Sequence, residues 1–255
     1  MGGNDALIGF SGFVGKTLLK QRDFDHHYRS TNIEQIQNNS FDTVVCAGAP
    51  AQKWLANQKP NEDKQIITQL TAYLSTIKCN KFILISTVDV FQHPNNIDEN
   101  SHIDESNLHA YGLHRRQLEK FVMRHFNDYL IVRLPGLVGP GLKKNIIFDF
   151  LNKNNLDKIE SRGVFQFYPM VNLWSDIQSA IRAGLNLIHL TSEPVSVKEI
   201  AKEAFGLTFD NEASGSPANY NFQTCHATQY RYQYSKKETL LAIRAYAQSE
   251  PKAEK

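Results

Sequence analysis

Three side chains of this sequence have the types and spacing that acid–base chemistry requires. Tyr111 and Arg115 are four residues apart, so they would share one face of a helix. A tyrosine can act as a general acid when a nearby cation and a hydroxyl lower its pKa and orient it. Thr87 ends a predicted neighbouring strand and could supply that hydroxyl. Spacing alone favours a simple surface pair of tyrosine and arginine, so these residues need further support.

A glycine-rich segment lies between the first predicted strand and the first predicted helix, with the pattern GxxGxxG. Gly9 would allow a tight turn, Gly12 would let the backbone approach a pyrophosphate, and Gly15 would let the helix pack closely on the strand. The N-terminus of that helix would offer N–H groups and partial positive charge to phosphates. The alternative is an ordinary junction that needs a positive φ. The flanking strand and helix favour a dinucleotide site, which would also include Ser11, Phe13 and Val14.

The end of the second predicted strand bears on the choice of cofactor. An acidic residue that binds the ribose hydroxyls of NAD is expected ~20 residues after the glycine turn. The sequence instead has Arg29 and Ser30 there. A guanidinium can pair with a phosphate through two hydrogen bonds, which suits the 2′-phosphate of NADP(H). NADP(H) is therefore favoured over NAD(H), the alternative being a solvated surface arginine.

The elements that would position these residues alternate between strands and helices. Buried strands are predicted at 5–10, 42–48, 81–86 and 129–134, with a weaker one at 26–30, and helices at 13–21, 62–78 and 105–126. This alternation predicts a parallel sheet with helices on both faces. Ligands of such sheets lie at the carboxyl ends of the strands, where the Gly9 turn, Gly48, Thr87 and Pro135 would meet.

The second half of the chain has a weaker pattern. We predict a helix at 173–184, a strand at 185–190, a helix at 196–205 that starts with a capping box, a loop at 209–233 and a helix at 236–247. The predicted fold is α/β, a Rossmann-type doubly wound parallel sheet with a small C-terminal substrate lobe. Residues 1–141 would form the NAD(P)-binding domain, with 173–191 returning to it. The lobe would comprise 142–172 and 192–250, and 251–255 would be a tail.

Composition excludes several other classes of protein. The chain has 255 residues, 41% of them hydrophobic and 21% charged, with a formal net charge of +2. This balance is ordinary for a globular protein and gives no case for nucleic acid or an acidic membrane as a partner. No stretch approaches the ~18 apolar residues of a membrane helix, and no signal peptide is evident, so we expect a cytoplasmic protein. Three widely spaced cysteines predict neither a disulfide framework nor a metal site.

Four segments together resemble the extended short-chain dehydrogenase/reductases, the group of NAD-dependent sugar epimerases and dehydratases. They are the glycine turn, Ser86–Phe91 (STVDVF), Tyr111–Glu119 (YGLHRRQLE) and Arg133–Gly141 (RLPGLVGPG), in the order of the family. The chain is most similar to the short branch that includes dTDP-dehydrorhamnose reductase. Leu173–Ile181 further resembles the segment where the chain returns from the substrate lobe, so the resemblance covers about residues 5–205.

The resemblance implies roles for particular residues. Thr87 corresponds to the catalytic Ser/Thr, Tyr111 to the catalytic tyrosine and Arg115 to the catalytic lysine, and the last two would also contact the cofactor. Asp89 and Asn145 would contact the substrate. The adenosine or ribose path would be lined by Ala47, Gly48 and Ala49, and the nicotinamide by Pro135, Gly136, Leu137 and Val138.

The sequence departs from the family at Arg115, where a lysine is usual. In the family that lysine binds the nicotinamide ribose and lowers the pKa of the tyrosine. Arginine keeps the charge, but the exchange is not conservative at such a site. The expected function is therefore an NAD(P)-dependent oxidoreductase or epimerase acting on a sugar or nucleotide-sugar carbonyl, with a homodimer as one possible assembly. The alternative is a non-catalytic NADP(H)-binding sensor or scaffold of the same fold.

Overall fold

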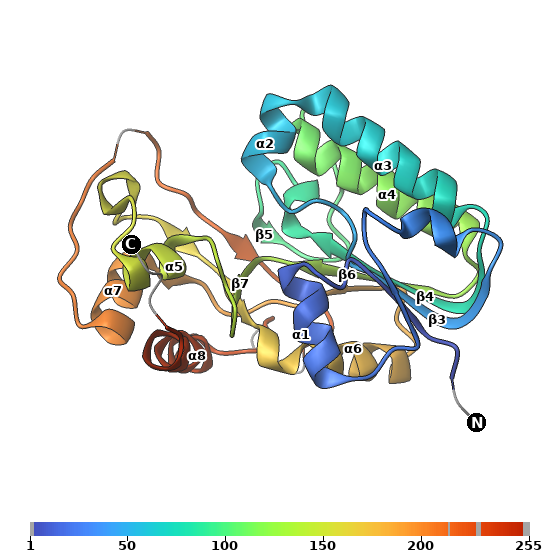
Figure 1. Ribbon diagram of the computed structural model, residues 1–255. Helices are drawn as coiled ribbons and strands as arrows, with labels where there is room; N and C mark the ends of the chain where they lie inside the picture. The colour runs from blue at the N-terminus through green and yellow to red at the C-terminus, as the bar shows by residue number, and fades with distance from the viewer. Residues whose placement is uncertain (1–2, 214, 228–230, 252–255) are drawn as a thin grey trace. The chain divides into compact units, whose positions relative to one another are not determined.

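The computed structural model describes residues 3–213, 215–227 and 231–251 (Figure 1). The chain forms two compact units. The first comprises Met1–Gln92, His102–Arg133 and Leu173–Ile188, and the second comprises His93–Ser101, Leu134–Asn172 and His189–Lys255. This division differs from the predicted domains in placing 93–101, 134–141 and 189–191 in the second unit. Most of the predicted tail, residues 252–255, lies outside the described residues.

The first unit is built on a six-stranded parallel sheet in the order β10-β6-β4-β3-β1-β2, which confirms the predicted Rossmann-type α/β class. Its strands are β1 (Ala6–Ile8), β2 (His26–Tyr28), β3 (Ser40–Cys46), β4 (Lys78–Thr87), β6 (Tyr129–Leu134) and β10 (Leu187–His189). The apolar residues of β1, β6 and the second halves of β3 and β4 suit a sheet that is buried on both faces, whereas β2 is an edge strand with two exposed histidines. Ile8, Val44, Phe82 and Ile131 belong to its core.

The strand order defines where a ligand can bind to this sheet. β1 pairs with β2 on one side and with β3 on the other, so the chain reverses its direction of winding between β1 and β3. In open α/β sheets the ligand crevice lies at such a switch point, outside the carboxyl ends of the strands. The glycine turn follows β1, and Ala47 to Ala49 follow β3, so both of these segments begin at this point.

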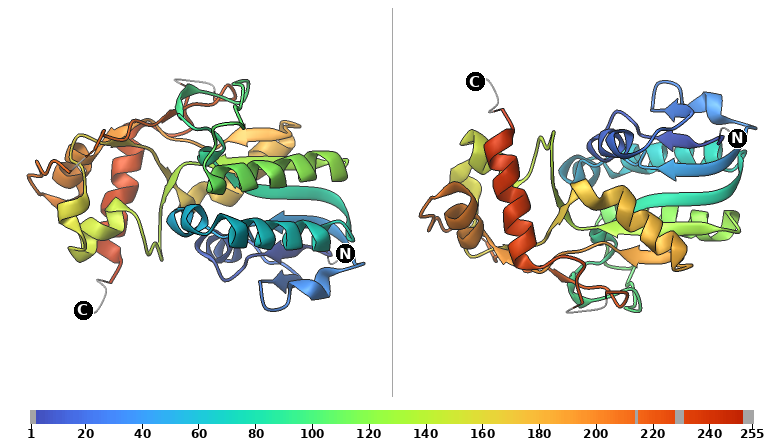
Figure 2. Two further views of the ribbon diagram at one scale, coloured as in Figure 1. Left: turned by 90° about the horizontal axis from the view of Figure 1, so that it is seen from above. Right: turned by 90° about the horizontal axis from the view of Figure 1, so that it is seen from below.

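Helices cover both faces of the sheet (Figure 1). One face carries α2 (Lys53–Gln58), α3 (Pro60–Leu74) and α4 (Ala110–His125), and the other carries α1 (Phe13–Gln21) and α6 (Leu173–Arg182). The view from above in Figure 2 shows α3 and α4 side by side. Among the described residues, no helix is long and apolar enough to cross a membrane.

Helix α4 begins later than its apolar pattern predicts, at Ala110 rather than at 105. The reason is a polar turn around Asp104. One carboxylate oxygen of Asp104 accepts hydrogen bonds from the Ser106 amide at 3.0 Å and hydroxyl at 2.6 Å, and the other accepts one from Asn107 at 3.0 Å. Such local bonds compete with the helix and delay its start.

The second unit contains three helices and short paired strands. The helices are α5 (Ile146–Asn152), α7 (Val197–Phe205) and α8 (Lys236–Ser249), and they pack on one another. The strand pairs are β7 (Gly136–Val138) with β9 (Phe167–Pro169), β8 (Val164–Phe165) with β11 (Val195–Ser196), and β5 (Asn95–Ile97) with β12 (Asn221–Phe222). Helix α7 starts with the predicted capping box, in which Ser196 and Glu199 bond to each other's backbone N–H groups.

Candidate active site

The glycine turn has the geometry expected of a phosphate cradle. Gly9 has φ +85°, and a Cβ on it would lie 2.3 Å from the Ala47 carbonyl oxygen. A Cβ on Gly15 would lie 2.1 Å from the Gly9 carbonyl oxygen, so α1 packs directly on the turn. In α1, all of whose residues are described, no side chain caps the N-terminus at Gly12. The first N–H groups of the helix therefore suit the phosphates of a dinucleotide.

Arg29 directly follows β2 and lies beside the glycine turn. The Gly9 amide donates to the Tyr28 carbonyl at 2.7 Å, which joins the end of β2 to the turn. The Arg29 guanidinium lies 5.9 Å from the centre of the Phe10 ring, and its Nε donates to the Thr31 hydroxyl at 2.9 Å. Arg29 and Ser30 are exposed. The guanidinium is therefore accessible beside the glycine turn, and its role as a reader of the 2′-phosphate stays a prediction.

Thr87 and Asp89 form the next part of the site, where β4 ends. The chain turns there into a short 3-10 helix, Val88–Val90, whose cap is Thr87. The Thr87 hydroxyl accepts a hydrogen bond from the Asp89 amide at 3.2 Å and donates to the Asp89 carboxylate at 3.4 Å. The Thr87 hydroxyl also acts on the phenol of Tyr111, whose pKa it lowers. Thr87 therefore contributes to the electrostatics of Tyr111, the second residue proposed for acid–base chemistry.

The start of α4 fixes the position of Tyr111. His109 caps the helix, and its Nδ1 accepts from the Gly112 amide at 3.0 Å. Gly112 lets the helix approach the turn after β4 closely, since a Cβ there would lie 2.0 Å from the Asp89 carbonyl oxygen. The Tyr111 amide donates to the side chain of Asn57 on α2 at 3.0 Å. Tyr111 is therefore held at the N-terminus of α4 by contacts with β4 and α2.

Charged neighbours act on Tyr111 with opposite signs. Burial raises its pKa above the ordinary value of 10.0, and Asp89 adds to this increase. Arg115, the hydroxyl of Thr87, and Lys53 each oppose that increase. The net pKa is raised, so Tyr111 is a protonated phenol at neutral pH and can serve as a proton donor.

Arg115 lies against Tyr111, and its Nη1 donates a hydrogen bond to the Tyr111 backbone carbonyl at 3.4 Å. Its guanidinium carbon is 4.0 Å from the centre of the Tyr111 ring, a cation–π contact. Its Nη1 forms an ion pair with Asp63, and its Nη2 donates to the Pro50 carbonyl at 2.5 Å. The Arg115 side chain is 3% exposed and that of Asp63 5%. Asp63 also contacts His114 Nδ1 at 2.6 Å, so this buried cluster joins α4 to the first turn of α3.

Lys53, at the start of α2, forms an ion pair with Asp89 at 2.6 Å. Its side chain is 42% exposed, and that of Asp89 is 17% exposed. Burial lowers the pKa of His109, and Lys53 lowers it further. The sequence analysis assigned no role to Lys53, His109 or Asp63. Lys53 lies on α2, a six-residue helix that was not predicted, and Asp63 and His109 act through contacts that no local sequence pattern signals.

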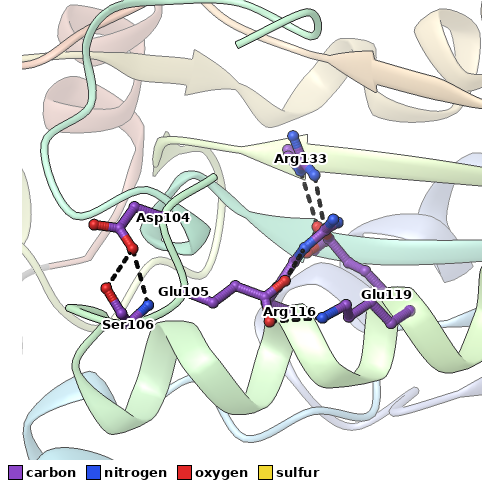
Figure 3. Close-up of polar contacts among 8 residues, drawn as sticks. Asp104, Glu105, Ser106, Arg116, Glu119 and Arg133 are labelled. Carbon is purple, nitrogen blue, oxygen red and sulfur yellow. Dashed lines mark hydrogen bonds and ion pairs between the residues drawn. The ribbon is translucent and has the colours of Figure 1, made fainter. Parts of the chain in front are cut away.

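A second buried ionic network joins α4 to the sheet (Figure 3). Glu119 is fully buried and accepts two hydrogen bonds from Arg133 on β6, at 2.9 and 2.8 Å. It also accepts from Ser86 at 2.6 Å and Arg116 at 2.9 Å. Burial alone would raise the pKa of Glu119, but these donors bring it below its ordinary value. The network ties α4 to β4 and β6 and so fixes the helix that carries Tyr111.

The remaining predicted residues belong to the second unit. Pro135 precedes β7, and Gly136, Leu137 and Val138 form that strand. Asn145 caps α5: its side-chain oxygen accepts from two amides of the helix at 3.0 and 3.3 Å, and its Nδ2 donates to Leu137 at 2.9 Å. These bonds explain an asparagine with φ +103° without a ligand. The contacts of these residues with a cofactor or substrate stay predictions.

One group of potential metal ligands occurs among the described residues, although the sequence predicts no metal site. Ligand atoms of Glu99, Cys225 and His226 lie within 4.8 Å of one another. The Glu99 carboxylate already accepts from the His189 amide at 2.7 Å, the Thr224 hydroxyl at 2.5 Å and the Cys225 amide at 2.8 Å. These bonds give the cluster a role in holding the loop around residue 225.

Comparison with protein families places the geometry in context. The sequence model described as "NAD dependent epimerase/dehydratase family" matches residues 22–179. The chain belongs to the NAD dependent epimerase/dehydratase family. That match contains Thr87, Tyr111 and Arg115 and begins after the glycine turn, so the turn is supported by its own geometry. No curated protein sequence matches the chain.

Solved structures share the fold of this family member at low sequence identity. The UDP-N-acetylglucosamine 4-epimerase of Methanobrevibacter ruminantium M1, in complex with UDP-N-acetylmuramic acid, is similar with a TM-score of 0.75 and 14% identity, covering 96% of this chain and 97% of that one. The dTDP-4-dehydrorhamnose reductase of Bacillus anthracis str. Ames, in complex with NADP, has a TM-score of 0.72 and 18% identity, with 96% and 98% covered. WbmH of Bordetella bronchiseptica, in complex with NAD⁺, has a TM-score of 0.70 and 15% identity, and the match covers 97% of this chain and 99% of that one.

Proposed function

We propose that this chain is an NADP(H)-dependent oxidoreductase or epimerase that acts on the carbonyl of a sugar or nucleotide-sugar. The observation that carries the proposal is the packing of the start of α4, with Tyr111 beneath the Arg115 guanidinium, against the turn after β4 that begins at Thr87. These are the residue types that hold and protonate a carbonyl oxygen, and they lie in the unit that contains the glycine turn. The substrate class is inferred from the family and from the nucleotide-sugars named with its structural relatives.

In the proposed reaction, each residue of the candidate site would have a separate role. The bound nicotinamide would supply or accept hydride. Thr87 would hold the carbonyl oxygen, and the phenol of Tyr111 would give that oxygen its proton in the reductive direction. Arg115 would stabilise the resulting phenolate through its charge over the ring. Asp89, beside Thr87, would contact the substrate hydroxyls.

The preference for NADP(H) is supported by Arg29 and by the lack of an acid at the end of β2. The 2′-phosphate would pair with the exposed guanidinium of Arg29, with the Ser30 hydroxyl beside it. Related structures contain NADP in one case and NAD⁺ in another, so the family as a whole does not determine the choice.

A second function, binding of NADP(H) without turnover, is favoured by one observation. Arg115 is committed to Asp63 and Pro50 rather than exposed toward a ligand. A chain with this substitution could retain the dinucleotide site and lack efficient chemistry, as a sensor or scaffold would. Oxidation of NADPH upon addition of sugar and nucleotide-sugar carbonyls separates the two functions.

The proposal is tested by Tyr111→Phe, which keeps the ring and removes the proton. Turnover should fall by ~10²–10⁴, the usual contribution of a positioned acid. NADPH affinity should stay within a few fold, because at most one hydrogen bond is lost. Both are measured through the absorbance and fluorescence of NADPH. Tyr73→Phe on α3, whose hydroxyl accepts from Gln69 at 2.9 Å, is the matched control and should keep full activity. A fully active Tyr111→Phe variant would contradict the acid assignment.

A further inference from the structure

The contacts of Arg115 bear on which cation of this chain would bind the nicotinamide ribose of the cofactor. The resemblance gives one residue two tasks, to lower the pKa of the tyrosine and to bind the nicotinamide ribose. Arg115 lies over the Tyr111 ring and can perform the first task. Its ion pair with Asp63 is buried on both sides, and removing one partner of a buried pair is strongly destabilising. Arg115 is therefore held away from the second task.

Contacts before and after Lys53 in the chain place it beside Tyr111 and Arg115. Before it in the chain, the Pro50 carbonyl is bound by Arg115. After it, Asn57 accepts from the amide of Tyr111. Lys53 itself reaches Asp89, the residue that shares hydrogen bonds with Thr87. The segment that leaves the switch point after Gly48 thus runs along the first turn of α4 with Lys53 beside the site.

We propose that Lys53, rather than Arg115, is the cation that binds the hydroxyls of the nicotinamide ribose, and that Asp89 holds it ready. This inference rests on the proposed function. An ion pair with a 42% exposed lysine is weak, so Lys53 can exchange Asp89 for a ribose hydroxyl at little cost. The flexible stem and three donors of a lysine suit such an exchange, whereas the fork of Arg115 is fixed by its partners.

The electrostatics of the site agree with this division between the two cations. Arg115 and Lys53 both lower the pKa of Tyr111, against the effects of burial and of Asp89. His109 faces the same group of charges from the cap of α4. The site therefore contains two cations near the phenol, one buried and fixed and one partly exposed.

The test compares two probes that differ in the nicotinamide half. NADPH contains both halves of the cofactor, and 2′,5′-ADP contains only the adenosine half. Lys53→Met should weaken NADPH by about tenfold or more, the loss expected for a hydrogen bond from a charged group. It should leave the affinity for 2′,5′-ADP unchanged, and Lys53→Arg should restore most of the NADPH affinity. Dissociation constants are measured by calorimetry for both probes.

Two further variants make the result specific. Lys59→Met, which removes a 51% exposed lysine paired with Glu62 just after α2, should change neither affinity. Asp89→Asn releases Lys53 and should bind NADPH at least as tightly as wild type. Equal weakening of both probes by Lys53→Met, no weakening of either, or a loss of NADPH affinity in Asp89→Asn would each overturn the inference. Wild-type protein that binds neither probe, nor NADH and ADP, would instead overturn the proposed function on which it rests.

Discussion

Single residues carry the proposed choice of dinucleotide and set the electrostatics of Tyr111. Arg29 stands where an acidic residue would read the ribose of NAD, and it lies next to the glycine turn through the bond between Gly9 and Tyr28. Tyr111 lies where burial and Asp89 keep it protonated while Arg115 and Lys53 limit the rise in its pKa. Each of these effects depends on one charge at one position, so a single substitution can test each of them.

Arg29→Ala should weaken NADPH much more than NADH. The variant removes one charge-assisted hydrogen bond to the 2′-phosphate, worth ~1.5–3 kcal/mol, which corresponds to about a ten- to hundredfold loss. NADH lacks that phosphate, so its affinity should hardly change. Fluorescence titration with both dinucleotides measures the difference. Arg124→Ala, at an exposed arginine in the last turn of α4, is the control. Equal weakening of NADPH and NADH would mean that Arg29 is not the reader of the phosphate.

At the scale of elements, the glycines of the turn have separable roles. Gly12 has φ −75°, and a Cβ on it would meet only the Gly9 carbonyl oxygen, at 3.4 Å. The fold therefore accepts a side chain at Gly12, whereas the α1 packing excludes one at Gly15. Gly15 is required by the junction of helix and strand, whereas a role of Gly12 in binding the ligand is a prediction.

Gly12→Val should fold normally and lose NADPH binding, because the side chain would occupy the path of the pyrophosphate. Gly15→Ala should lower the free energy of unfolding by about 1–3 kcal/mol, the usual cost of overpacking. Denaturant titrations and NADPH binding, measured on both variants, separate the two effects. Wild-type NADPH affinity in Gly12→Val would remove the glycine turn from the binding site.

The sequence correctly predicted elements that have a strong apolar periodicity. It failed where local polar hydrogen bonds set the start of a helix and where a helix is very short. The helix Phe13–Gln21 and the strand Tyr129–Leu134 have the predicted bounds, because apolar residues and flanking breakers define both. Helix α4 begins five residues late, since Asp104 and its neighbours form a polar turn. The residues of the candidate acid–base site were named from family order, but the partners of Arg115 were not. Asp63 is 52 residues from Arg115 in the chain, and no local pattern signals such a contact.

At the scale of the whole molecule, buried groups that stay protonated make the fold sensitive to alkaline pH. Burial raises the pKa of the Cys46 thiol from 9.0 to about 11. Burial and Asp128 raise that of Cys79 from 9.0 to about 12. The pKa of Tyr111 is raised in the same direction. Above pH 9 the unfolded chain releases these protons while the folded chain retains them, so the folded state binds more protons.

The free energy of unfolding should therefore be constant with respect to these groups below pH 9 and fall as the pH rises from 9 toward 11. Each retained proton contributes about 1.4 kcal/mol of lost stability per pH unit within that window. Denaturant unfolding at a series of pH values, under reducing conditions, measures the slope.

Cys46→Ala leaves a small cavity and lowers stability at every pH, but it removes one titrating thiol from the core. Its slope between pH 9 and 11 should consequently be smaller than that of the wild type by about one proton. Cys225→Ala, which removes an exposed thiol, should change the slope less. The prediction would be contradicted by a wild-type stability that does not fall over this range. It would also be contradicted by a Cys46→Ala slope equal to that of the wild type, because the pKa of the Cys46 thiol would then not be raised by folding.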